Sequence, residues 1–61
     1  MWIRTEDGWY VHELRGACFV TWVTAADKAN AAYFPEKDID GWIELLSKMV
    51  GIPLEAVAPF A

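Results

Sequence analysis

The chain has 61 residues and a mass of 6.9 kDa, which predicts one domain over residues 1–61 and leaves no room for a second core. Hydrophobic residues make up 56% of it and charged residues 23%, so the composition predicts a folded rather than a disordered chain. The net charge of -4 argues against partners that select a basic face. We therefore expect no direct binding to nucleic acid and no binding to an anionic membrane.

The single cysteine, Cys18, excludes an internal disulfide framework and a cysteine-rich metal site. The longest uncharged run lies between Arg15 and Asp27 and is too short to span a bilayer. Glu6 and Asp7 interrupt the beginning of the sequence before any apolar run of signal-peptide length. The sequence therefore predicts a cytoplasmic location.

The first 24 residues predict a three-stranded antiparallel meander. Its strands are Trp2–Thr5, Trp9–Leu14 and Ala17–Thr24, which are rich in β-branched and aromatic residues. Asp7-Gly8 and Arg15-Gly16 have the composition of two-residue hairpin turns.

Two-residue turns would fix the register of this meander and therefore the two faces of the sheet. Trp9 would lie opposite Trp22, and Val11 opposite Val20. Both faces would then be largely apolar, which is unusual for an antiparallel sheet with one solvated side. The first would hold Trp2, Arg4, Trp9, Val11, Glu13, Cys18, Val20 and Trp22, and the second Ile3, Thr5, Tyr10, His12, Leu14, Phe19, Thr21 and Val23.

The next segment predicts a short helical turn. Thr24 and Asp27 are spaced as in a capping box, with Asp in place of Glu, and they open an Ala-rich segment over residues 25–33. Phe34 precedes Pro35, which disfavours further helix. We therefore expect a short helix or 3₁₀ turn that ends before Pro35.

The longest element is an amphipathic helix between Ile39 and Val50. Its start carries two candidate caps, Asp38 and Asp40, and Gly51 is suited to its end. Apolar residues recur on one side at helical spacing. The stripe consists of Ile39, Trp42, Ile43, Leu46, Met49 and Val50.

The tail after this helix contains Pro53 and Pro59, which exclude a long helix, and residues 54–57 could form an edge strand. The sequence thus predicts an α+β fold. A three-stranded antiparallel meander packs on one amphipathic helix, with a short helical turn before it and a possible C-terminal edge strand.

Catalytic and metal chemistry find little support. The segment from Glu36 resembles a calcium loop in its first positions, but Ser47 occupies the twelfth, where a bidentate Glu should close the site. His12 and Cys18 would lie on opposite faces of the meander, unless the second turn has three residues, so they would not form a nucleophile pair. We expect no enzymatic activity, no metal site and no cofactor.

Four acidic residues form the largest charge feature. They can be a solvated helix face, or a negative patch that docks on a basic surface of a protein partner. The basic surface could be one that normally holds nucleic acid. The patch consists of Glu36, Asp38, Asp40 and Glu44.

The two apolar sheet faces are the second feature, because one helix can cover only one of them. We expect the tryptophan-rich face to be the core and the other to be an interface, for a partner or for a second copy of the chain. Tyr10 and Phe19 would be its anchors. Alternatively, the Ala-rich segment and the tail, with Val57 and Phe60, close that face. The candidate interface consists of Ile3, Tyr10, His12, Leu14 and Phe19.

The arrangement resembles small phage-encoded accessory proteins of the anti-CRISPR type. The features that carry the resemblance are the Asp7-Gly8 hairpin, the stretch from Trp22 through Asp27 to Phe34, and the acidic-capped helix from Asp38. The resemblance implies a non-enzymatic inhibitor that occludes a basic, nucleic-acid-handling surface of a host complex. The alternative is a homodimeric structural or assembly subunit joined through the apolar sheet face.

Overall fold

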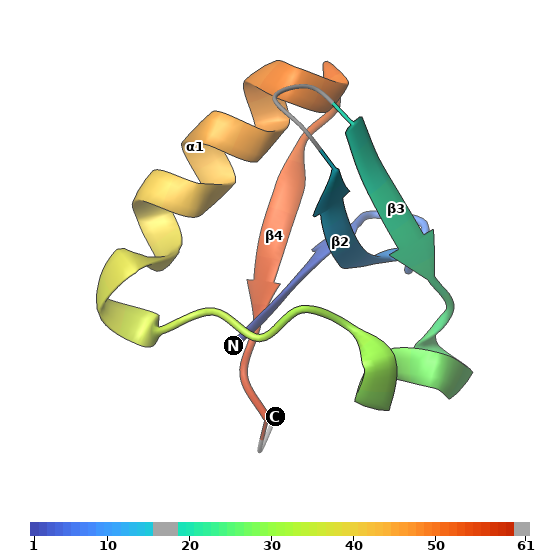
Figure 1. Cartoon of the computed structure of the whole chain (residues 1–61). Coiled ribbons are helices and arrows are strands. Elements are labelled where there is room, and N and C mark those ends of the chain that lie inside the picture. The colour runs from blue at the N-terminus through green and yellow to red at the C-terminus, as the bar shows by residue number, and fades with distance from the viewer. Residues whose placement is uncertain (16–18, 60–61) are drawn as a thin grey trace.

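A computed structural model, which describes residues 1–15 and 19–59, shows an α+β fold (Figure 1). Its antiparallel sheet has the strand order β3-β2-β1-β4. Helix α1 (Ile39–Val50) lies across one face of the sheet. The α+β class, the short helical turn, the amphipathic helix and the C-terminal edge strand are confirmed. The other elements are β1 (Trp2–Thr5), β2 (Tyr10–Arg15), β3 (Phe19–Val23), the 3₁₀ helices η1 (Ala25–Asn30) and η2 (Glu36–Asp38), and β4 (Leu54–Val57).

The hairpin turn between β1 and β2 has three residues rather than the two that we predicted. The Gly8 N–H donates to the Thr5 carbonyl (3.1 Å), and the Thr5 N–H donates to the Trp9 carbonyl (2.9 Å). Gly8 has φ +92°, a conformation that favours glycine. Arg4 therefore pairs with Tyr10, and the one-residue difference moves every side chain of β1 to the other face of the sheet.

The pairing of β2 with β3 also differs from the prediction, because β2 contains a bulge. Val11 pairs with Trp22, whereas Leu14 pairs with Val20, and the register shifts between Val11 and Glu13. A bulge adds one residue to a strand without a partner, so residues beyond it are displaced. The expected pairs Trp9–Trp22 and Val11–Val20 are wrong. The predicted Arg15-Gly16 turn falls partly on residues 16–18, outside the described residues.

The buried core lies between the sheet and α1, and it combines residues that we had assigned to different sheet faces. Ile3 and Val11 share it, although we had placed them on opposite faces. Partly buried Val20 and Trp22 pack against this core, whereas Trp2 lies on the other side of β1. The buried cluster consists of Ile3, Val11, Phe34, Ile39 and Leu46.

The second face of the sheet is partly covered by the chain itself. Tyr10 is only 4% exposed. The Trp2 ring meets the rings of Tyr10 and Tyr33 edge-on, with centroids 6.5 and 5.6 Å away, and the Lys28 ammonium lies 5.4 Å from its centroid. Of our two alternatives for this face, cover by the Ala-rich segment is therefore seen around Trp2. Phe60 of the tail lies outside the described residues.

The segment after η1 brings the chain to the helix side of the sheet. The Ala32 N–H donates to the Val11 carbonyl (2.8 Å), beside the bulge in β2. Two hydrogen bonds then join Phe34 to Met1. The Phe34 N–H donates to the Met1 carbonyl (2.8 Å), and the Met1 amino group donates to the Phe34 carbonyl (2.7 Å). These bonds place the Phe34 side chain in the core, where the centroid of its ring lies 5.3 Å from the ring centroid of Trp42.

The helices end near the residues that the sequence predicted, but the expected side-chain capping bonds at their starts do not form. Gly51 takes φ +73° and its N–H donates to the Ser47 carbonyl (2.8 Å), as expected for a glycine that ends a helix. Asp38 is the N-cap residue of α1, but its side chain makes no capping bond. The Thr24 hydroxyl donates to the Asp27 carboxylate (3.5 Å) instead of forming a capping box. Within the described residues, no helix is long and apolar enough to cross a bilayer.

Candidate functional site

The four predicted acidic residues lie in η2 and the first half of α1. We call Glu36, Asp38, Asp40 and Glu44 the acidic edge. All four are exposed. Glu44 accepts a hydrogen bond from Lys48 one turn later (3.3 Å), whereas the other three take part in no ion pair within residues 1–15 and 19–59.

The surroundings of the acidic edge include the start of a helix and one basic residue. The positive end of the helix dipole stabilises carboxylates at the start of α1. Lys37 is the one basic residue of η2, and it lines a shallow hollow with Asp38 and Trp42. Because Glu36, Asp38 and Asp40 are exposed and take part in no ion pair among the described residues, they can meet the charges of another molecule.

The acidic edge is not a calcium loop. The residues after Asp38 are already helical, so they cannot wrap around an ion as a loop does. Among the described residues, no group of three histidine, cysteine or acidic side chains is placed to hold a metal ion.

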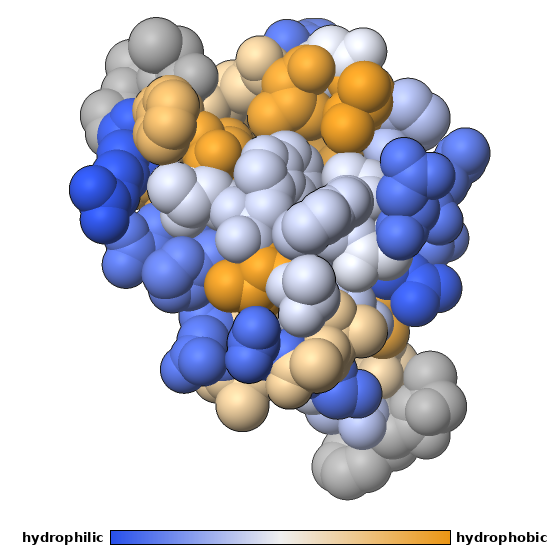
Figure 2. Space-filling model, turned by 90° about the vertical axis from the view of Figure 1, so that its right-hand side faces the viewer, coloured by the Kyte–Doolittle hydropathy of each residue, from blue (hydrophilic) through white to orange (hydrophobic). Residues whose placement is uncertain are grey.

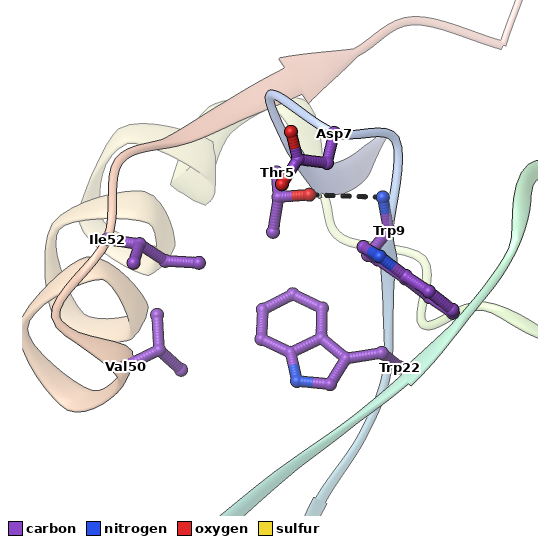
Figure 3. A pocket seen from close by; sticks show the side chains of 6 residues that line it. All are labelled: Thr5, Asp7, Trp9, Trp22, Val50 and Ile52. Carbon is purple, nitrogen blue, oxygen red and sulfur yellow. Dashed lines mark hydrogen bonds between the residues drawn. The ribbon is translucent and has the colours of Figure 1, made fainter.

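The other end of α1 borders an apolar hollow of about 420 Å³, which we call the tryptophan cleft. In Figure 3 the Trp22 indole projects into the space that Val50 and Ile52 border on one side. Figure 2 shows this side of the molecule, where apolar side chains gather in its upper part between hydrophilic flanks. The cleft is lined by Thr5, Asp7, Trp9, Trp22, Val50 and Ile52.

The hairpin turn forms one wall of the tryptophan cleft. The buried Thr5 hydroxyl accepts a hydrogen bond from the backbone N–H of Trp9 (3.1 Å), which holds the residue that carries the indole against the end of β1 (Figure 3). Trp9 is 47% exposed, a large exposed area for an indole. The three-residue turn also places Asp7 at the rim of the cleft.

The end of α1 forms the opposite wall. Gly51 reverses the chain immediately after Val50, and Ile52 then stands exposed at the cleft. A smaller hollow of about 160 Å³ adjoins it through Thr5, Asp7 and Ile52, and Glu6 lines that hollow too. Among the described residues that line the two hollows, two are acidic and none is basic.

The five residues of the predicted apolar interface are dispersed. Ile3 and Tyr10 are buried, so the expectation that both lie exposed on one open face is wrong. The reason is the register of β1, which carries Ile3 into the core. His12 is half-buried and its Nδ1 lies 3.3 Å from the Thr21 hydroxyl, while Leu14 and Phe19 are exposed. The considered pairing of His12 with Cys18 falls outside the described residues.

The tryptophan cleft was missed at the sequence level. Its lining residues come from the first hairpin, β3 and the end of α1, so their meeting depends on the register and on the Gly51 turn. One signal was available, because Trp9 lies directly after a glycine turn and Ile52 directly after a helix-ending glycine.

The chain matches no protein-family model, no curated protein and no solved structure. Its function must therefore be argued from its own residues. The described surface offers two features at opposite ends of α1, namely the acidic edge and the tryptophan cleft.

Proposed function

We propose that this chain is a non-enzymatic protein-binding module whose acidic edge docks on a basic surface of a protein partner. One observation carries the proposal. Glu36, Asp38 and Asp40 are exposed at the start of α1 and take part in no ion pair within the described residues. Complementary charges of this kind raise the association rate and select the partner.

The support beneath the acidic edge favours binding as well. Ile39 and Leu46 fix α1 to the sheet through the core. The carboxylates of α1 therefore stand on a backbone that needs no ordering when a partner binds, which lowers the entropic cost of association.

The specific form that we propose is inhibition by occlusion. A basic surface that handles nucleic acid attracts an acidic edge for the same electrostatic reason that it attracts phosphates. The resemblance to phage-encoded proteins of the anti-CRISPR type favours a host complex as the target and the cytoplasm as the location. Such a module acts by covering the surface and needs no catalytic group.

The test compares two variants with the same net charge. Glu36→Gln/Asp38→Asn/Asp40→Asn neutralises three carboxylates of the acidic edge. Its control, Glu13→Gln/Asp27→Asn/Glu55→Gln, neutralises three carboxylates elsewhere. Both change the net charge from -4 to -1, since each removes three negative charges.

The two variants and the unmodified chain serve as baits in a lysate of the native host, read by mass spectrometry. We expect a partner that the unmodified chain and the control retain, that the acidic-edge variant loses, and that added nucleic acid displaces. The same partner should then bind nucleic acid in isolation and release it when the chain is added. Equal retention by both variants would contradict the proposal.

The second candidate is a homodimer joined through the apolar sheet face. It has less support, because Ile3 and Tyr10 are buried within one chain. Its remaining basis is Phe19, which is 59% exposed on the edge strand β3. Sedimentation velocity at micromolar concentration distinguishes the candidates, since a monomer at every concentration rejects the dimer.

A further inference from the structure

The tryptophan cleft plays no part in the docking of the acidic edge, yet it has the composition of a site for a cation. Two indoles and two aliphatic side chains surround the hollow, and a carboxylate stands at its rim (Figure 3). Its volume of about 420 Å³ lies in the range of small-ligand clefts, about 300–1,000 Å³.

We propose that the tryptophan cleft binds an arginine side chain of the basic protein partner. This inference rests on the proposed function, because the partner supplies the arginine. It adds a second contact point at the opposite end of α1 from the acidic edge.

The apolar part of the cleft suits the stem and the plane of arginine. Val50 and Ile52 offer an apolar surface to the methylene groups of arginine. Arginine commonly buries these groups while its guanidinium stays in contact with water or polar atoms. The guanidinium plane stacks on aromatic faces, and indole is the strongest partner for a cation. Trp9 and Trp22 supply those indoles, and the half-exposed Trp9 is open to such a contact.

The charged part of the cleft selects a cation over an anion or a neutral group. Asp7 lines both hollows, and the neighbouring Glu6, which lines the smaller one, adds a second negative charge. Within the described residues neither carboxylate takes part in an ion pair. A guanidinium can donate two parallel hydrogen bonds to one carboxylate, so Asp7 would fix the orientation of the incoming side chain.

The partly buried Trp2 indole lacks this combination. The Trp2 ring already has the Lys28 ammonium at 5.4 Å, so a basic group of the chain itself occupies its surroundings. The Arg4 guanidinium on the same face binds Glu55 at 2.7 Å, and the hydrogen bonds to Glu55 and then to Tyr10 raise the pKa of Arg4. The two basic groups near Trp2, Lys28 and Arg4, therefore already have partners within the chain.

The test is a titration with a blocked pentapeptide, Gly-Gly-Arg-Gly-Gly, followed by NMR of the indole N–H signals. We expect the signals of Trp9 and Trp22 to shift and that of Trp2 to stay. The matched probe replaces arginine by citrulline, which keeps the shape and loses the charge. Its Kd should be about tenfold higher, because a charge-assisted hydrogen bond and a cation–π contact are lost.

Variants of the chain sharpen the result. Asp7→Asn keeps a residue suited to the turn and should raise the Kd of the arginine peptide by about threefold or more. Asp27→Asn makes the same chemical change on another surface and should leave the Kd unchanged. Trp9→Leu keeps an apolar side chain at an exposed position and should also raise the Kd by about threefold.

Two outcomes would overturn the inference. The first is equal affinity for the arginine and citrulline peptides. The second is a shift confined to Trp42, whose side chain lines the hollow beside the acidic edge. That second result would remove the cleft as an arginine site while leaving the proposed function in place. Equal retention of the partner by the acidic-edge variant and its control, with arginine-peptide binding to the cleft intact, would separate the two in the other direction.

Discussion

The two ends of α1 carry the two candidate binding features, and they differ in how their residues relate to the fold. At the start of the helix, the residues of the acidic edge are exposed, and among the described residues only Glu44 of the four has an ion-pair partner. At its end, Val50 and Trp22 line the tryptophan cleft while they are partly buried, and Thr5 is buried altogether. The side chains of the acidic edge therefore contribute little to the packing of the fold, whereas several side chains of the cleft are also part of that packing.

This difference determines what each substitution measures. Neutralising an exposed carboxylate changes charge and leaves the packing unaltered, so a loss of binding can be assigned to the electrostatic contact. Changing a cleft residue alters packing and binding together. The following predictions use stability to test that contrast, from the largest expected effect to the smallest.

Leu46→Ala should remove the support that both ends of α1 share. Leu46 is fully buried, so the substitution should lower the free energy of unfolding by about 2–5 kcal/mol. A chain of this size has a total stability of only about 3–9 kcal/mol. Urea unfolding followed by tryptophan fluorescence measures the loss. The adjacent Leu45→Ala, at a 50% exposed position, should change stability by less than about 0.5 kcal/mol, and equal losses would refute this account of the core.

Gly51→Ala should destabilise the fold by about 1–2 kcal/mol, because φ +73° is costly for a residue with a Cβ. A Cβ at this position meets no atom within 4 Å, so the cost is conformational. Gly41→Ala is the matched control. Its Cβ is equally free of contacts, but it lies inside α1, where alanine should stabilise by about 0.5–1 kcal/mol. Thermal unfolding should show shifts of opposite sign, and shifts of the same sign would contradict the argument.

Thr5→Val tests the wall of the tryptophan cleft. It removes the buried acceptor of the backbone N–H of Trp9 and should lower the free energy of unfolding by about 0.5–1.5 kcal/mol. Thr21→Val removes a similar bond, from the Glu13 N–H, where water can replace it, and should cost less. Only Thr5→Val should also shift the indole N–H signal of Trp9. A shift of that signal in both variants would show that Thr5 does not position the cleft.

Glu44→Gln should have the smallest effect. Its bond to Lys48 is an exposed pair one helical turn apart, which contributes about 0.3–0.5 kcal/mol at low salt. In about 1 M salt the difference from the unmodified chain should vanish, because screening then acts over about 3 Å. A loss above about 1 kcal/mol would show that the acidic edge is part of the fold after all.

The elements that the sequence predicted correctly depend on local patterns. Apolar residues at helical spacing, followed by Gly51, were sufficient for α1, and the acidic edge followed from it because its members are neighbours in the chain. The two prolines of the tail were sufficient to suggest β4 between them.

The sheet faces could not be predicted, because one residue in a turn decides them. Glu6, Asp7 and Gly8 suit a two-residue and a three-residue turn alike, since glycine takes a positive φ in both. The bulge in β2 at His12 has no signal of its own in the sequence. Because the tryptophan cleft depends on both, it could be found only in three dimensions.

The pairing of β1 with β4 has a consequence for synthesis of the chain. Trp2 pairs with Val57 across the two strands. A ribosome that adds about 5–20 residues per second synthesises these two residues about 3–11 s apart. During that interval one side of the first strand lacks its neighbour and offers its backbone groups to any nascent chain nearby. Synthesis of Leu54–Val57 supplies the strand that pairs with this open side of β1 and completes the sheet.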